Sequence, residues 1–254
     1  MERMTANRTQ SQARHAPING KIPPQLVWDQ VWAKDIYADP SIRRRRSKQK
    51  VSIITDQGFS ISDEQHLLEV GCGGGAVLEE IASCCPDRGY LIGCDISRVA
   101  LKLARENLTA IQATPLLLWT DAEKLPFERE SIDIIIAFGI LEHLSQPMTA
   151  LAEMSRILKP SGQVYFSTSS VYSSVYVARR IREYLSNWPY GYQKNYRPIE
   201  FIELIGSFFH VTQVTVAQTG FDFPLLATAD RLVAIVSREW GRYILVAAEK
   251  AEAE

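Results

Sequence analysis

The sequence is poor in cysteine, nearly balanced in charge and without a long apolar run. Its four cysteines, Cys72, Cys84, Cys85 and Cys94, form no C-x-x-C pair, and the adjacent pair fits no zinc-site spacing. The 28 basic and 29 acidic residues give a net charge of -1, so the charge does not point to a nucleic acid as the main partner. No apolar run approaches the roughly 18 residues of a membrane span. We therefore expect reduced thiols, no metal site and no transmembrane segment.

The first 24 residues are expected to form a disordered tail. The stretch "MERMTANRTQSQARHAPING" is polar and lacks the apolar core of a secretory signal. With neither a signal nor a membrane span visible, the expected location is the cytoplasm.

Residues 25–60 are expected to form an N-terminal helical cap. Trp28, Trp32 and further apolar residues recur there at helical spacing, and an Asp-Pro pair at 39–40 interrupts the pattern. A basic run, Arg43 to Arg46, follows. It fits either a solvated helix face or a contact with a phosphate-bearing substrate, and both interpretations stay open.

Apolar segments of strand length alternate with helical patterns across residues 61–254. The expected strands are Leu67–Val70, Tyr90–Cys94, Pro115–Trp119, Ile132–Phe138, 162–168, Val211–Ala217 and 242–250. The expected helices are Ala76–Ser83, 97–108 with Ser97 as N-cap, 147–160 ended by Pro160, and Ile199–Phe208. Continuous apolar strands alternating with helices indicate an α/β fold with a doubly wound, Rossmann-like and mostly parallel sheet. Two irregular blocks, near 170–197 and 218–241, are expected as helical cap insertions over one edge of it.

The stretch "LLEVGCGGGAVLEEIA" places a dense glycine turn between a strand and a helix. Such a turn exposes backbone N–H groups at a helix N-terminus, where a nucleotide or an anion can bind. Asp95 ends the next strand and is suited to accept both hydroxyls of a ribose. An adenosine-containing ligand is therefore expected, but the turn by itself also satisfies the G-x-G-x-x-A pattern of dinucleotide sites.

Four ordered stretches carry a resemblance to a known family. They are "LLEVGCGGG", "LIGCDIS", "WTDAEKLPFERESIDIIIAFGILEHL" and "MSRILKPSGQVYFST", and they cover roughly residues 65–168. In their order and spacing they resemble the class I S-adenosylmethionine-dependent methyltransferases, in the branch of small-molecule and quinone methyltransferases. The resemblance implies S-adenosylmethionine as cofactor and a late antiparallel strand, "RYILVAAEK", at one edge of the sheet.

The resemblance also implies roles for the residues of the glycine turn. Gly71, Gly73 and Gly75 are expected to pass close to the methionine and ribose portions of the cofactor, with Cys72 between them. Glu69, which precedes the glycines, resembles the acidic residue that orients the amino-acid end through water.

Further cofactor contacts are implied by the resemblance at the following strand ends. Asp95 is expected to bind the ribose hydroxyls and Ile96 to pack on the adenine. Asp121 is expected to accept from the adenine amino group, and Ala122 to offer its backbone N–H. Phe138 is expected to line the methionine side of the pocket.

Plainer interpretations of the polar residues remain open. Asp95 can cap the following helix, and Asp121 can be a turn former beside Thr120. Glu142 and His143 in "LEHL" can satisfy a helix end. His143 is nevertheless our candidate catalytic residue, as a general base or a holder of water.

The acceptor pocket is expected to come from the N-terminal helix and the two irregular blocks. Block 170–197 is rich in tyrosine, which can stack on an apolar acceptor or pack the cap onto the sheet. The stretch "FPLLATADRLVAIVSREW" has helical periodicity and can line the acceptor channel or touch a membrane surface.

The leading hypothesis is a methyltransferase that acts on a small-molecule acceptor by in-line transfer. Two alternatives stay open. One is a non-catalytic S-adenosylmethionine-binding protein, and the other is a nicotinamide-dependent dehydrogenase, which the Gly-Ala variant of the turn allows.

Overall fold

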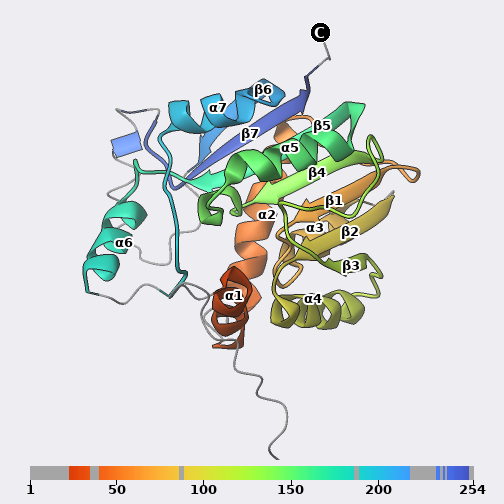
Figure 1. Ribbon diagram of the computed structural model, residues 1–254, viewed down its shortest axis with the longest axis horizontal. Coiled ribbons are helices and arrows are strands. Elements are labelled where there is room, and N and C mark those ends of the chain that lie inside the picture. Colours follow the sequence, from red (N-terminus) through yellow and green to blue (C-terminus); the bar gives the residue numbers. More distant parts are fainter. Residues whose placement is uncertain are drawn as a thin grey trace, which may run out of the picture.

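The computed structural model describes residues 23–34, 40–85, 89–185, 189–217, 233–234, 237 and 239–251. Its centre is a seven-stranded sheet in the order β3-β2-β1-β4-β5-β7-β6 (Figure 1). The strands are β1 (His66–Val70), β2 (Tyr90–Asp95), β3 (Leu116–Trp119), β4 (Ile132–Phe138), β5 (Leu158–Ser169), β6 (Phe209–Ala217) and β7 (Tyr243–Lys250). The helices are α1 (Pro24–Ala33), α2 (Pro40–Asp56), α3 (Ala76–Cys84), α4 (Arg98–Ala110), α5 (Pro147–Ile157), α6 (Ser174–Tyr184) and α7 (Pro198–Gly206), with a 3-10 turn, η1, at Leu141–His143.

The strands β1 to β5 are parallel, and the order of the sheet reverses beside β1. The chain runs outward from β1 through β2 to β3, then returns to β4 on the other side of β1 and continues to β5. Ligands of doubly wound sheets bind beyond the carboxyl ends of the strands at such a reversal. The expected α/β fold class is confirmed, and it places the candidate site at the ends of β1 and β4.

The last strand is antiparallel to its neighbours, as expected, but it is not outermost. β7 lies between β5 and β6 and pairs with both. Its run from Ile244 to Ala248 is buried throughout, so it needs neighbours on both sides and cover on both faces. The pattern of β6 is mixed, with an exposed centre, as is typical of an edge strand.

The junction between α5 and β5 differs from the sequence-based expectation. The helix ends at Ile157 rather than Pro160, and the strand begins at Leu158 rather than Gly162. Pro160 disfavours helical backbone at Lys159, and Leu158 already pairs with Ile132 of β4. An irregularity in the pairing after Ile132 then admits the extra residues before the regular ladder.

The block at 170–197, which we expected to be a helical cap insertion, contains the helix α6. Ser173 caps it, since its hydroxyl accepts the Tyr176 N–H at 3.2 Å. Most of the second block, 218–241, lies outside the described residues, as does the expected tail up to residue 22. Among the described residues no helix is long and apolar enough to span a membrane.

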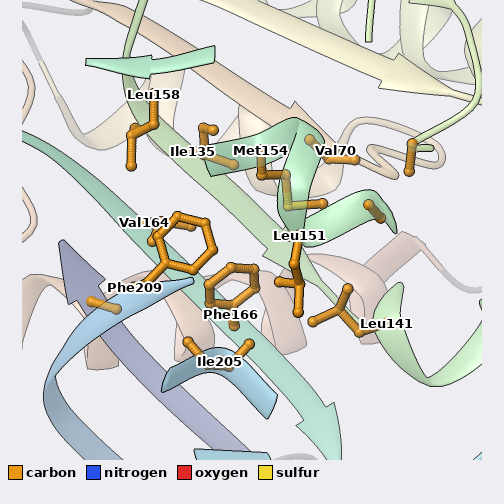
Figure 2. Close-up of a cluster of buried hydrophobic side chains, with 14 of the residues drawn as sticks. Val70, Ile135, Leu141, Leu151, Met154, Leu158, Val164, Phe166, Ile205 and Phe209 are labelled. Atoms are coloured by element: carbon orange, nitrogen blue, oxygen red, sulfur yellow. The ribbon is translucent and has the colours of Figure 1, made fainter. Parts of the chain in front are cut away.

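Two apolar clusters cover the two faces of the sheet. On one face, Leu151 and Met154 of α5 and Ile205 of α7 surround Phe166 and Phe209 (Figure 2). The other cluster joins the sheet to α2, α3 and α4. With both faces filled, the carboxyl edge is left for binding.

The helix α1 lies against the carboxyl edge. The Asp29 carboxylate of α1 accepts the Ser97 hydroxyl at 2.7 Å, just before α4 begins. The indole of Trp32 packs so closely on Gly73 that a Cβ built there would meet it at 2.5 Å. α1 therefore covers the glycine turn.

Candidate active site at the carboxyl edge of the sheet

The turn between β1 and α3 depends on glycine for its backbone geometry. Gly71, Gly73 and Gly75 have φ of +73°, +52° and +76°, which side chains rarely tolerate. Ile140 faces Gly71, and Leu108 faces Gly75, at 3.0 Å from a built Cβ in each case. Bare main chain at these positions therefore lets other groups approach closely.

The backbone donors of this turn are mostly used inside the protein, contrary to our expectation of bare N–H groups. The N–H groups of Gly71 and Cys72 both donate to Cys94 O, at 2.8 and 2.9 Å, and that of Gly75 donates to Cys72 O. The Gly73 N–H donates to the Asp95 carboxylate at 2.9 Å. Residues of the neighbouring strand β2 accept most of these hydrogen bonds. The turn therefore lets other groups approach its main chain closely, but it does not present a nest of backbone N–H donors.

Cys72 contributes its side chain to the core. It is buried in the cluster with α3, and burial raises the pKa of its thiol. Its Sγ lies 3.0 Å from a Cβ built at Gly93 of β2. Only the backbone of Cys72 is therefore left for a cofactor.

Asp95 is the buried carboxylate at the end of β2. Its Oδ2 accepts the Gly73 N–H and its Oδ1 accepts the Ser97 N–H at 2.8 Å. Burial raises the pKa of Asp95 to about 6, against the lowering effect of these hydrogen bonds, and the nearby charge of Asp29 raises it further. The carboxylate is thus ionised at neutral pH, and its oxygens retain lone pairs for ligand hydroxyls.

The end of β3 lies beside that of β2. Trp119 pairs with Asp95, and its indole N–H donates to Ile96 O at 2.8 Å. Asp121 follows and is exposed, and its Oδ1 accepts the Glu123 N–H at 3.0 Å, so it does form a turn. Its neighbour Ala122 is buried.

Glu69 is a buried carboxylate within β1. Burial raises its pKa well above the usual range, the nearby Lys50 of α2 opposes that effect, and Asp95 adds to it. Glu69 Oε2 is buried without a hydrogen-bond partner among the described residues. A buried acceptor of this kind favours a ligand that brings donors.

Lys50 was not predicted from the sequence. Its Nζ lies 5.3 Å from the ring centroid of Phe138, the last residue of β4, and its charge acts on Glu69. It comes one helical turn after Arg46, but no local pattern distinguishes it from other lysines. Only the crossing of α2 over the sheet brings it to the site.

His143 ends η1, just beyond β4. Its Nδ1 lies 3.1 Å from the backbone oxygen of Tyr192, and the Trp28 ring meets it edge-on with 4.8 Å between centroids. Since a carbonyl only accepts, Nδ1 carries the proton and Nε2 is left as an acceptor. Burial lowers the pKa of His143 from its ordinary value, so the ring is neutral at pH 7.

Glu142 has a structural role. Its Oε1 accepts the N–H and the hydroxyl of Ser169 at 3.3 and 3.4 Å, and its backbone oxygen accepts the Lys194 N–H at 2.7 Å. It thereby joins η1 to the end of β5 and to the segment after α6.

The carboxyl edge therefore brings together three groups of predicted residues. The glycine turn and Asp95 are joined by a hydrogen bond, Ile96 and Asp121 lie at adjacent strand ends, and Phe138 lies across β1 from them. Among the described residues no cluster of histidine, cysteine or acidic side chains is suited to hold a metal ion.

Comparison with known proteins supports a family assignment. A family model described as a methyltransferase domain matches residues 68–166, the part of the chain that runs from β1 into β5. The matched domain, the curated relatives and the solved structures together support a class I S-adenosylmethionine-dependent methyltransferase. The cofactor of this methyltransferase is S-adenosylmethionine, and the comparisons support neither alternative, the non-catalytic binder or the dehydrogenase.

Individual relatives agree with this assignment. The methyltransferase is 28% identical over 162 residues to a ubiquinone biosynthesis O-methyltransferase of Photobacterium profundum, a match that covers 61% of this chain and 67% of the relative. A second such relative, from Vibrio atlanticus, is covered over 60% of its length. The chain thus spans about two thirds or less of the curated relatives that it matches.

Solved structures of other methyltransferases share the fold of this chain. The methyltransferase in complex with the Haloferax volcanii Trm112 activator matches with a TM-score of 0.70 at 18% identity, over 91% of this chain and 99% of that one. Geranyl diphosphate C-methyltransferase from Streptomyces coelicolor matches with a TM-score of 0.67 at 12% identity, again over 91% and 99%.

Proposed function

We propose that this methyltransferase transfers the methyl group of S-adenosylmethionine to a small-molecule acceptor. The observation that carries the proposal is the pairing of a buried carboxylate, Asp95, with a left-handed glycine turn at the point where the strand order reverses. The names of two relatives support a small acceptor, because one belongs to ubiquinone biosynthesis and the other methylates geranyl diphosphate.

The polar groups of the edge fit the adenosyl part of the donor. Asp95 would hold the ribose hydroxyls, because both of its oxygens retain acceptor capacity. Ile96 would pack on the adenine, with Asp121 accepting from its amino group and the Ala122 N–H facing the ring. Asp121 still has its Oδ2 for this, since its turn uses Oδ1.

The amino-acid end of the donor carries two opposite charges, and two residues match them. Glu69, whose Oε2 is buried and without a partner among the described residues, would face the ammonium group. Lys50, whose charge acts on Glu69, would face the carboxylate. Phe138 would line the methionine side, and the backbone of Gly71, Cys72, Gly73 and Gly75 would lie beneath it.

Catalysis would rest mainly on alignment. When bound, S-adenosylmethionine supplies an electrophilic methyl group on a sulfonium. The protein holds the acceptor in line and excludes water with α1, and such positioning supplies much of the rate. For an acceptor that arrives protonated, neutral His143 would take the proton at Nε2, while Nδ1 stays bonded to Tyr192 O.

The domain organisation is part of the proposal. Residues 25–60 would act as a helical cap on the methyltransferase domain, 61–254. Contacts of α1 with the glycine turn and with His143 support this division.

A labelled-transfer assay tests the proposed function. The full chain is incubated with methyl-labelled S-adenosylmethionine and a fractionated metabolite extract, and products are identified by mass. We expect label in a low-molecular-mass product that is absent from an Asp95→Ala reaction. Label found only in protein or nucleic acid would contradict a small-molecule acceptor.

A further inference from the structure

The basic side chains of α2 lie in three different environments. The guanidinium of Arg43 lies against Gly74, and that of Arg44 pairs with Glu79 at 2.6 Å. Arg46 and Lys50 are one helical turn apart and therefore share a face of the helix. That face meets the start of β7, because Lys50 Nζ lies 4.7 Å from the ring centroid of Tyr243.

Tyr243 lies at the carboxyl edge although its strand runs in the opposite direction. It is the first residue of β7 and pairs with Ser169, the last residue of β5. The Arg242 guanidinium lies 5.2 Å from its ring centroid. Lys50 Nζ lies near the rings of both Tyr243 and Phe138. Phe138, Lys50, Tyr243 and Arg242 therefore form a continuous cluster of aromatic and cationic side chains, which begins beside the proposed donor contacts.

The electrostatic surroundings of the Tyr243 hydroxyl are positive. Burial alone would raise the pKa of a tyrosine, but the pKa of Tyr243 is lowered from its ordinary value by Arg242, Lys50 and Arg46. Glu142 acts in the opposite direction, and one of its oxygens is engaged by Ser169. The surroundings of the Tyr243 hydroxyl thus favour a negatively charged group.

This cluster lies away from the proposed adenosine contacts. Asp95 ends β2 and Asp121 comes after β3, on one side of β1. Tyr243 lies on the other side of β1, beside the end of β5, which is the second strand from β1 in that direction. Lys50 and Phe138 lie at the border between the two halves. Arg46 and Arg242 therefore act on a part of the edge that the proposed donor contacts do not use.

The geometry points to an oxyanion subsite for the methyl acceptor, formed by Arg46, Arg242 and the Tyr243 hydroxyl, with the Phe138 and Tyr243 rings against an apolar body. This inference rests on the proposed function and adds the acceptor's chemical class, an acid with an apolar part. Arginine pairs with carboxylate or phosphate oxygens in a fork, and a phenol adds one donor.

Binding of matched small probes tests the subsite without knowledge of the acceptor. Benzoate, phenyl phosphate and benzamide are titrated into the full chain by calorimetry, with and without S-adenosylhomocysteine. We expect one of the two anions to bind at least tenfold more tightly than benzamide, which has the shape of benzoate but no charge. The tighter anion identifies the group as a carboxylate or a phosphate.

Variants locate the binding. Arg242→Gln, Arg46→Gln and Tyr243→Phe should each weaken the preferred anion at least fivefold and leave benzamide unchanged. Lys48→Gln is the matched control, because Lys48 is an exposed cation on the same helix.

The outcomes separate the two proposals. Equal binding of benzamide and both anions by the wild-type chain would overturn the subsite, with no variant needed. An anion preference that survives all three substitutions would also overturn it. Arginine-dependent anion binding without any binding of S-adenosylhomocysteine would support the subsite and contradict the proposed function.

Discussion

The Gly73 N–H donates to Asp95 Oδ2 at 2.9 Å and so ties the glycine turn after β1 to the end of β2. The other oxygen of the same carboxylate accepts the Ser97 N–H at the start of α4. One side chain therefore orients two backbone segments and still has lone pairs for a ligand. Under the proposed function, cofactor affinity and the geometry of the turn depend on the same group.

Removal of this carboxylate should weaken cofactor binding strongly. We expect Asp95→Ala to lose about 2–3 kcal/mol of binding free energy for S-adenosylhomocysteine, since hydrogen bonds to a charged group are lost. Titration calorimetry measures the change. Asp63→Ala, which removes an exposed carboxylate before β1, is the control and should leave the affinity unchanged. Equal affinities for the two variants would remove Asp95 from the site.

The affinity for the cofactor should depend on pH through Asp95. Burial raises its pKa to about 6, so the carboxylate is ionised above that pH and protonated below it, where its acceptor capacity is reduced. We expect a constant affinity for S-adenosylhomocysteine from pH 7 to 8, and a loss that approaches about tenfold per pH unit below 6.

Asp95→Asn provides the control for this titration. It should bind more weakly than the wild type but lose the slope near pH 6, because the amide does not titrate. A slope that persists in this variant would assign the titration to another buried acid, such as Glu69, whose pKa burial also raises.

The residues predicted correctly from the sequence are those with local signals. Apolar runs give β1, β2 and β4, and the serine before α4 caps it as expected, accepting the Ala100 N–H at 3.1 Å. Lys50 and Tyr243 carry no such signal. They lie at the carboxyl edge of the sheet because α2 crosses the sheet and β7 inserts beside β5, and both arrangements depend on contacts between distant segments.

The backbone donors of the glycine turn illustrate the same limit. Glycine density predicts a turn with little side-chain bulk, and Gly71, Gly73 and Gly75 indeed have positive φ, with side chains of Ile140, Trp32 and Leu108 packed close to them. It does not reveal that Cys94 O and the Asp95 carboxylate take the N–H groups, because that pairing depends on the position of β2. The sequence therefore predicts the shape of the turn better than its hydrogen bonding.

Gly75 should tolerate alanine poorly. Its φ is +76°, and a Cβ there would meet Leu108 Cδ1 at 3.0 Å and Ala104 Cβ at 3.1 Å. We expect Gly75→Ala to lower the free energy of unfolding by about 2–4 kcal/mol, through backbone strain together with displacement of α4. Urea denaturation measures it.

Gly206→Ala is the matched control for this substitution. Nothing lies within 4 Å of a Cβ built at Gly206, the last residue of α7. The change should be neutral or stabilising by up to about 1 kcal/mol, since alanine restricts the unfolded chain. Similar losses in both variants would contradict a special role for the turn.

His143 should affect turnover rather than cofactor binding. Its ring is neutral because burial lowers its pKa, and Nε2 is the nitrogen left to accept a proton. For an acceptor that must lose a proton, we expect His143→Gln to reduce kcat by about 100-fold. The affinity for S-adenosylhomocysteine should change by less than about twofold, since no proposed cofactor contact is lost.

Steady-state kinetics with the acceptor found by labelled transfer measures this effect. In the wild type, kcat should fall as the pH drops below the pKa of the ring, which lies under the ordinary value of 6.5. His210→Gln is the control, because His210 is exposed on β6, the strand farthest from the glycine turn on that side of the sheet. An unchanged kcat in His143→Gln, or an equal loss in both variants, would exclude His143 as the base and leave it to hold Tyr192 and α1 in place.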